Sequence, residues 1–209
     1  MTFWLLSGPV RRERLNEMKN ILVILGHPVA DTFSNSLLEA YTDAAESTGA
    51  RVEIIRLRDL RFDLNFSSGY RGHQELEPDL KMAQESIREA DHLVLIYPNW
   101  WSTFPALMKG FIDRTLLPGF AFKYNKGVLN WEKRLKGRSA RVIVTMDTPP
   151  WYYRWVLRSP GHHAMGKGIL GFCGFHPVRF TTIGPLKVSS EERRRRWIEK
   201  VRRLGQRQI

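Results

Sequence analysis

The chain has 209 residues, a length that fits one α/β domain, and 43% of them are hydrophobic, which excludes an intrinsically disordered polymer. The formal net charge of +12 favours anionic partners such as nucleic acid, anionic lipid or a phosphorylated cofactor. Cys173 is the only cysteine, so an intrachain disulfide is excluded and a reducing, cytoplasmic compartment is expected, and no apolar run approaches the ~20 residues of a membrane span.

Residues 1–17 precede the first strand-like run and break the pattern of the remaining chain. We interpret them as an N-terminal extension to a single domain over 18–209, or as residues upstream of a true start at Met18. The short apolar patch at 3–6 has no leading positive charge, and its length and flanks do not fit a signal peptide.

Five runs of apolar and β-branched residues lack the alternation of a half-exposed strand: 20–26, 52–55, 92–98, 140–146 and 178–183. Such runs are typical of strands that are buried on both faces, as in a parallel sheet.

Apolar residues at helical spacing predict four helices between these strands, over 34–47, 78–90, 105–116 and 161–172. A last helix is expected to open at Ser189, with Glu192 three residues later completing a capping box. The strict alternation of strand and helix predicts an α/β fold with helices on both faces of the sheet. Right-handed crossovers then favour a doubly wound, five-stranded parallel sheet in the order 2-1-3-4-5.

In open α/β sheets, ligands bind beyond the carboxyl ends of the strands, where the strand order reverses. This rule directs attention to three loops, 26–34, 98–104 and 146–153. The first loop ends at a helix N-terminus with hydroxyl groups from Thr32 and Ser34, and His27 lies nearby. Free N–H groups and the helix dipole make such an end an anion site, although a plain N-cap is the alternative.

The second loop carries the adjacent tryptophans Trp100 and Trp101, whose flat rings suit stacking on a planar heterocycle. A hydrophobic corner between helix and sheet is the alternative interpretation.

The third loop offers Tyr152 and Tyr153 as hydrogen-bond donors to a ligand or substrate, or as aromatics that close the core beside a stiff turn. His162 and His163 follow, and a histidine there could relay a proton or be an inert surface residue. No pair of His or Cys has metal-ligand spacing, so no metal site is expected.

Arginines and lysines crowd residues 193–207. No nucleic-acid-binding module flanks this run, so we interpret it as the solvated face of the last helix and expect no nucleic-acid partner.

Three segments resemble the NAD(P)H:quinone oxidoreductases of flavodoxin-like fold, a group that includes DT-diaphorase, the modulator-of-drug-activity proteins and the potassium-efflux ancillary reductases. They are I-L-V-I-L-G-H-P-V-A-D-T-F-S-N-S-L at 21–37, a segment at 90–122 and G-I-L-G-F-C-G-F at 168–175. The middle segment carries the most specific frame, W-W-x-x-x-P-A-x-x-K-G-x-x-D-R, with G-F-A-F after it.

The resemblance implies a flavin at the switch point, and it assigns residues to each part of that flavin. The phosphate and ribityl chain would be held by His27, Thr32, Phe33, Ser34 and Asn35. The isoalloxazine ring would be lined by Pro98, Asn99, Trp100, Trp101 and Ser102, and its pyrimidine edge by Thr145, Met146, Asp147 and Thr148. Many members have T-T-G-G where this chain has T-M-D-T followed by two prolines, which lack the N–H of a glycine.

The resemblance further implies hydride transfer from NAD(P)H to the flavin and then two-electron transfer to a quinone-like acceptor, in a ping-pong relay. Tyr153 and His162 would be the catalytic residues, and the protein would be a homodimer. We expect FMN rather than FAD, because no additional adenine-binding segment is recognisable. The alternatives are a flavodoxin-type electron carrier and a regulatory accessory subunit of a membrane transporter, whose basic last helix would meet the transporter or anionic lipid.

Overall fold

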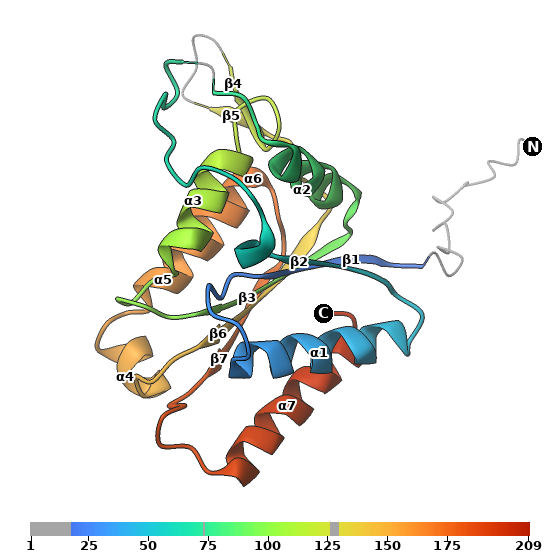
Figure 1. Ribbon diagram of the computed structural model, residues 1–209, viewed down its shortest axis with the longest axis vertical. Helices are drawn as coiled ribbons and strands as arrows, with labels where there is room; N and C mark the ends of the chain where they lie inside the picture. Colours follow the sequence, from blue (N-terminus) through green and yellow to red (C-terminus); the bar gives the residue numbers. More distant parts are fainter. Residues whose placement is uncertain (1–17, 73, 126–129) are drawn as a thin grey trace, which may run out of the picture.

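A parallel sheet of five strands is the centre of the molecule in the computed structural model, which describes residues 18–72, 74–125 and 130–209 (Figure 1). Its strands are β1 (Asn20–Leu25), β2 (Arg51–Arg56), β3 (His92–Pro98), β6 (Ser139–Thr145) and β7 (Val178–Ile183). Their order is β2-β1-β3-β6-β7, which confirms the predicted doubly wound topology. The expected extension over 1–17 lies outside the described residues.

The three central strands carry the continuous burial that the sequence predicts. Every residue of β3 is buried, and β1 and β6 are buried after their first residue. The edge strands β2 and β7 are partly exposed, because each has a neighbour on one side only.

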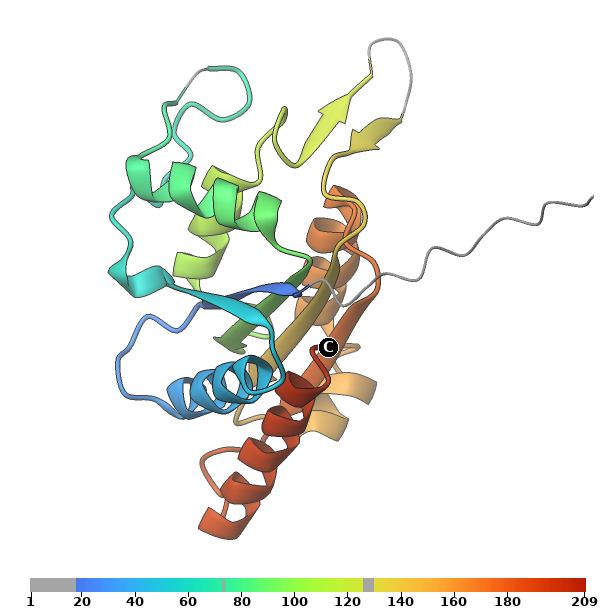
Figure 2. The same ribbon diagram turned by 90° about the vertical axis from the view of Figure 1, so that its right-hand side faces the viewer.

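Helices cover both faces of the sheet (Figures 1 and 2). One face packs against α1 (Phe33–Glu46) and α7 (Glu191–Gln206), which bury Leu37 and Val201. The other face packs against α2 (Pro78–Glu89), α3 (Ala106–Thr115) and the run formed by α5 (Pro160–His163), a π-helical segment (Ala164–Leu170) and α6 (Gly171–Cys173). The expected helix over 161–172 is therefore three joined pieces.

The structure corrects the predicted start of the last helix. Ser190 is its N-cap, and the Ser190 hydroxyl accepts a hydrogen bond from the N–H of Arg193 at 3.3 Å. The hydroxyl of Ser189 instead donates to the carbonyl of Leu186 at 2.6 Å, so the expected capping box with Glu192 is wrong.

Four short elements were not predicted from the sequence. They are a 3-10 turn (Leu57–Asp59), the antiparallel hairpin of β4 (Phe122–Tyr124) and β5 (Trp131–Lys133), and the helix α4 (Pro150–Trp155). In α4, Pro149 is the N-cap and Pro150 the first helical residue, so the prolines that suggested a stiff turn in fact begin a helix.

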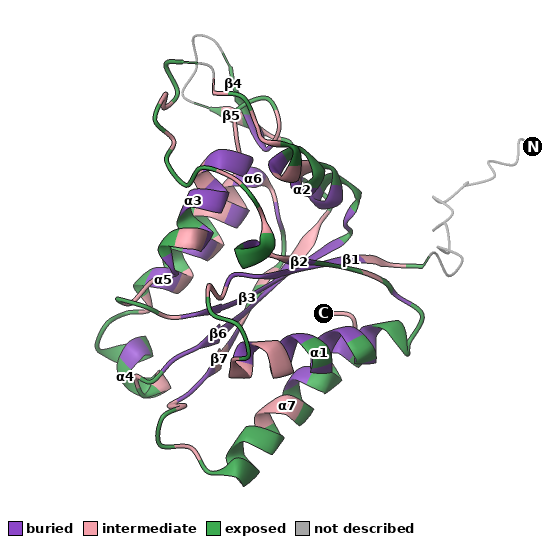
Figure 3. Cartoon of the chain, in the orientation of Figure 1, coloured by how far each residue is buried: buried purple, intermediate pink, exposed green. Residues whose placement is uncertain are grey.

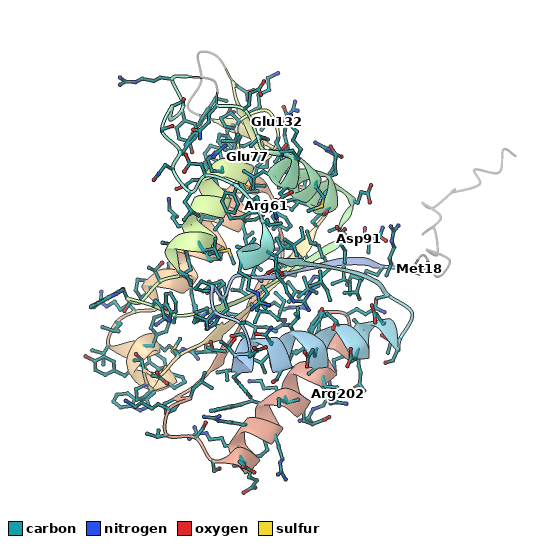
Figure 4. All side chains as sticks on the ribbon, in the orientation of Figure 1. Met18, Arg61, Glu77, Asp91, Glu132 and Arg202 are labelled. Carbon is teal, nitrogen blue, oxygen red and sulfur yellow. The ribbon has the colours of Figure 1, made fainter. Side chains whose placement is uncertain are left out.

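The buried guanidinium of Arg114 ties the long loop before α2 to α3. It donates to the carbonyl oxygens of Asp63 at 2.7 Å and Glu75 at 3.0 Å, and to a carboxylate oxygen of Glu77 at 2.8 Å. The Arg114 side chain is 1% exposed, whereas Glu77, labelled in Figure 4, is partly open to solvent. One residue of α3 thus fixes a loop that has little secondary structure of its own.

Replacement of Arg114 by Met should lower the free energy of unfolding by about 2–4 kcal/mol, because two carbonyls and a carboxylate lose their charged donor. The measurement is urea denaturation, with proteolysis of the loop before α2 as a local readout. Arg195→Met is the matched control, since its ion pair with Glu191 is exposed, and it should change stability by less than about 0.5 kcal/mol. Equal effects of the two substitutions would contradict the proposed tie.

Candidate functional site

Backbone hydrogen bonds at the ends of three adjacent strands bring the three predicted loops to one edge of the sheet. The N–H of Gly26, just after β1, donates to the carbonyl of Ile96 in β3 at 2.8 Å. The N–H of Asn99, just after β3, donates to the carbonyl of Thr145 in β6 at 2.7 Å. Because neighbouring strands lie about 4.8 Å apart, these loops begin side by side.

The N-terminus of α1 presents backbone donors at this edge. Thr32 is the N-cap, and the side-chain oxygen of Asn35 accepts hydrogen bonds from the Thr32 N–H at 3.2 Å and its hydroxyl at 3.1 Å. The N–H of Asn35 donates to the Thr32 carbonyl at 2.8 Å. The N–H groups of Phe33 and Ser34 have no hydrogen-bond partner in the described part of the chain, and with the helix dipole they favour an anion.

Ser34 and Phe33, both predicted to contact the phosphate, have side chains that pack within the protein. The Ser34 side chain is buried, and the ring of Phe33 packs edge-on against Trp197 of α7, with 6.2 Å between ring centroids. Both residues can therefore offer a phosphate their backbone N–H groups rather than their side chains. The guanidinium of Arg194 lies 6.0 Å from the centre of the Phe33 ring and adds positive charge beside the helix end. We predicted Arg194 to belong to a solvated face, and nothing in its spacing indicated this position.

His27 belongs to the first loop, lies beside Trp100 of the second, and has one ring nitrogen occupied. Its Nδ1 accepts a hydrogen bond from the Val29 N–H at 3.1 Å, and partial burial lowers the pKa of the imidazole below its usual value. The neutral ring then carries its proton on Nε2, which is a donor for a ligand. The ring centroid is 5.9 Å from that of Trp100, at an interplanar angle of 77°.

The second loop forms a tight two-residue turn at Trp101 and Ser102. Both have positive φ, 51° and 63°, and the turn is closed by two 3.0 Å hydrogen bonds between the backbones of Trp100 and Thr103. Asn and Gly favour this conformation, whereas Trp and Ser adopt it at a cost. The turn holds the Trp101 side chain 99% exposed, as an open aromatic surface rather than a core-filling corner.

The third loop leaves β6 after the buried residues Thr145 and Met146. The N–H of Met146 donates to the carbonyl of Ile183 at 2.9 Å, and a carboxylate oxygen of Asp147 accepts the N–H of Lys187 at 2.8 Å. Asp147 therefore directs its side chain toward the loop before α7, so only its backbone can face a ligand between the first two loops.

Tyr153 occupies a different position from the expected substrate-facing one. Its side chain is 1% exposed, its hydroxyl donates to the carbonyl of Ser102 at 3.3 Å, and it accepts the N–H of Gly161 at 3.0 Å. The hydroxyl thereby joins the Trp101–Ser102 turn to α5. Tyr152 is exposed instead.

His162 is held between Tyr153 and the edge strand β7. Its ring stacks on Phe180 with 4.4 Å between centroids and meets Tyr153 edge-on at 5.0 Å. Burial, helped by the neighbouring His163, lowers the pKa of His162 to about 4. The imidazole is thus neutral at physiological pH, a weak base that can accept or donate a hydrogen bond. Among the described residues, no group of three His, Cys, Asp or Glu side chains could hold a metal ion.

The amino-acid sequence is similar to a known family and to several oxidoreductases. The family described as "Flavodoxin-like fold" matches residues 19–207. An "Uncharacterized NAD(P)H oxidoreductase" of Haemophilus influenzae is 27% identical over 190 residues, which cover 86% of this chain and 91% of that protein. A "Ribosyldihydronicotinamide dehydrogenase [quinone]" of Mus musculus is 27% identical over 207 residues, which cover 85% of this chain and 86% of that protein.

Solved structures agree with the topology. A crystal structure from Streptococcus mutans superposes with a TM-score of 0.77 at 27% identity and covers 90% of this chain and 99% of its own. An FMN-dependent NADH-azoreductase from Bacillus anthracis, solved in complex with FMN, gives a TM-score of 0.69 at 20% identity and covers 91% of this chain and 99% of its own. The names of the relatives agree with the expected NAD(P)H-dependent oxidoreductase.

Substitution of Ser102 by Gly should raise the free energy of unfolding by about 0.5–1 kcal/mol, because glycine adopts a positive φ without strain. Thermal unfolding measures the change. Ser47→Gly is the matched control: Ser47 has an ordinary φ of −61° and its hydroxyl bonds the carbonyl of Ala44, so that variant should be less stable. A loss of stability in Ser102→Gly would contradict a strained turn.

The lowered pKa of His162 also predicts a pH dependence of stability. Its folded pKa of about 4 lies below the ordinary value of 6.5, so the unfolded chain binds the proton more readily. The stability from the neutral ring is full above about pH 6.5 and is lost as the pH falls toward 4.

His162→Phe keeps an aromatic ring against Phe180 and should flatten the stability profile in that window. His92, whose pKa burial lowers to about 3, is present in both proteins, so the difference between the two denaturation profiles isolates His162. Parallel profiles from pH 7 to pH 4 would rule out this titration.

Proposed function

The chain belongs to the flavodoxin-like fold family, and from this membership we propose that it is a flavin-dependent NAD(P)H oxidoreductase that passes two electrons to a quinone-like acceptor. The observation that carries the proposal is the convergence of three loops at one edge of the sheet. That edge combines N–H groups at the start of α1, which have no partner among the described residues, with an exposed tryptophan on a strained turn.

The residues present fit a flavin in three parts. The N–H groups of Phe33 and Ser34 and the Nε2–H of His27 would bind the phosphate, and Thr32 and Asn35 would hold the helix end in shape. The ring would lie on the loop formed by Pro98, Asn99, Trp100, Trp101 and Ser102. Its pyrimidine edge would meet the backbone after Thr145 and Met146, at the N–H groups of Asp147 and Thr148. Pro149 and Pro150 remove the next two donors, so this edge has fewer partners than in relatives with glycines there.

A bound flavin supplies the hydride chemistry, and the protein contributes orientation, polarity and protection from side reactions. NAD(P)H and the quinone-like acceptor would use the same open face beside Trp101 in turn, which is a ping-pong mechanism. His162 would offer a hydrogen bond from its neutral imidazole beside this face. Tyr153 is a positioning residue in this scheme, because its hydroxyl is committed to the backbone of Ser102 and Gly161.

We favour FMN over FAD, which agrees with the FMN complex of the Bacillus anthracis azoreductase that shares the fold. We also propose a homodimer, as the resemblance to the quinone oxidoreductases implies, and light scattering of the purified protein tests it.

The decisive experiment identifies the chromophore released when the purified protein is denatured. We expect FMN, whose absorbance in the native protein bleaches with NADPH under anaerobic conditions and recovers on addition of a quinone. Initial rates at several quinone concentrations should give parallel double-reciprocal lines. A protein that carries no flavin, takes up none and shows no flavin-dependent oxidation of NAD(P)H would overturn the proposal.

Trp101→Ala should weaken FMN binding about tenfold, since stacking on an aromatic ring contributes about 0.5–1.5 kcal/mol beyond the area it covers. Trp151→Ala is the control, because Trp151 is also exposed but lies on α4, beyond the residues 145–148 that would meet the pyrimidine edge. FMN titration of the apoprotein, followed by fluorescence, compares the two variants. Equal affinities would place the ring elsewhere.

A further inference from the structure

The short helix α4 and the residues after it expose a cluster of large apolar side chains. We call it the α4 aromatic surface; it comprises Trp151, Tyr152, Trp155, Val156 and Leu157. Trp151 is 63% exposed and Trp155 is 70% exposed. Figure 1 shows α4 at the periphery of the molecule, beyond the carboxyl ends of β6 and β7, and Figure 3 shows exposed residues along it.

The position of Tyr153 explains why these side chains point outward. Tyr153 is the one buried residue of α4, and its hydroxyl is bonded to the backbones of Ser102 and Gly161. Because this residue sets the inward face of a helix of six residues, its neighbours on either side are turned to solvent. Exposed apolar patches of this kind commonly mark a contact with a partner or a membrane.

Positive charge lies on and behind the α4 aromatic surface. The guanidinium of Arg154 lies 4.9 Å from the centre of the Trp155 ring. Behind α4 is a groove of about 820 Å³ whose polar lining includes Lys133, Arg154, Arg158, Ser159, His163, Lys167 and His176. None of the described residues that line this groove is an Asp or a Glu, and none of its arginines and lysines forms an ion pair with a described residue.

The charges decide between possible occupants of this surface. A second copy related by a twofold axis would set the same patch against itself, so Arg154 and Arg158 of both copies would face each other without a carboxylate. A bilayer of anionic phospholipid suits both the exposed aromatic rings and the positive charge. Indole and phenol rings favour the headgroup level, and arginines pair with lipid phosphates.

The basic helix α7 is a weaker candidate for such a contact. Four of its arginines are within ion-pair distance of glutamates on the same helix: Arg195, Arg196, Arg202 and Arg203. Its tryptophan, Trp197, packs against Phe33 rather than facing solvent.

We propose that the α4 aromatic surface docks the protein on anionic phospholipid bilayers, with the tryptophan rings at headgroup level and the basic groove receiving lipid phosphate. The contact is peripheral: none of the helices in the described part of the chain is long and apolar enough to cross a membrane. This inference does not depend on the proposed redox activity.

The test is co-sedimentation of the full-length protein with vesicles of equal parts phosphatidylglycerol and phosphatidylcholine, compared with vesicles of phosphatidylcholine alone. We expect binding to the anionic vesicles that weakens as salt is raised. Brominated phosphatidylcholine in the same vesicles should quench part of the tryptophan fluorescence, because some rings lie among the lipids.

Two double variants locate the contact. Trp151→Ala with Trp155→Ala should weaken vesicle binding more than about tenfold through the lost apolar burial. Arg154→Gln with Arg158→Gln should weaken it about fivefold for each charge removed. The charge-matched control on α7 is Lys200→Gln with Arg207→Gln, two exposed residues, and it should bind nearly as the wild type does. Circular dichroism of each variant checks that the fold is kept.

Several results would overturn the proposal. One is binding that is absent or independent of phosphatidylglycerol, and another is equal weakening by the α4 and α7 charge variants. Wild-type binding by the tryptophan variant would exclude the α4 aromatic surface. A dimer that becomes monomeric on loss of Trp151 and Trp155, with no binding to vesicles, would assign the surface to self-association.

Discussion

The register of β3 between β1 and β6 is the constraint on which the candidate site depends. The N–H of Gly26 bonds to β3 as the chain leaves β1, and the N–H of Asn99 bonds to β6 as the chain leaves β3. Backbone hydrogen bonds therefore place the loops next to one another whatever side chains they carry. Loop composition is free to serve binding, because the three buried strands supply the rigidity.

Much of the fold could be predicted because a central strand, which is buried on both faces, has a continuous run of apolar residues. The five strands and their order followed from five such runs and from the handedness of crossovers. The hairpin of β4 and β5 could not be found in the same way, since strands of three residues carry too little periodicity. The helix α4 was missed for another reason: Pro149 and Pro150 suit a turn and a helix start equally well, and tertiary contacts of Tyr153 decide between them.

The location of the candidate site was predictable, whereas the state of its side chains was not. Strand ends indicated the loops. The positive φ of Trp101, however, comes from a closed turn at two residues, Trp101 and Ser102, whose types do not favour that conformation. The lowered pKa of His162 depends on its burial, and one face of the ring is covered by Phe180, which lies in a strand that follows later in the chain. Arg194 approaches the start of α1 only because α7 packs beside it.

Gly161 brings three parts of the chain into a contact with no spare room. A side chain at this position would begin within 2.8 Å of the Ser102 carbonyl and within 2.9 Å of the Tyr153 hydroxyl. A relative that carries a larger residue in place of Gly161 must also have lost the tyrosine or reshaped the tryptophan turn, so the three positions should covary across the family.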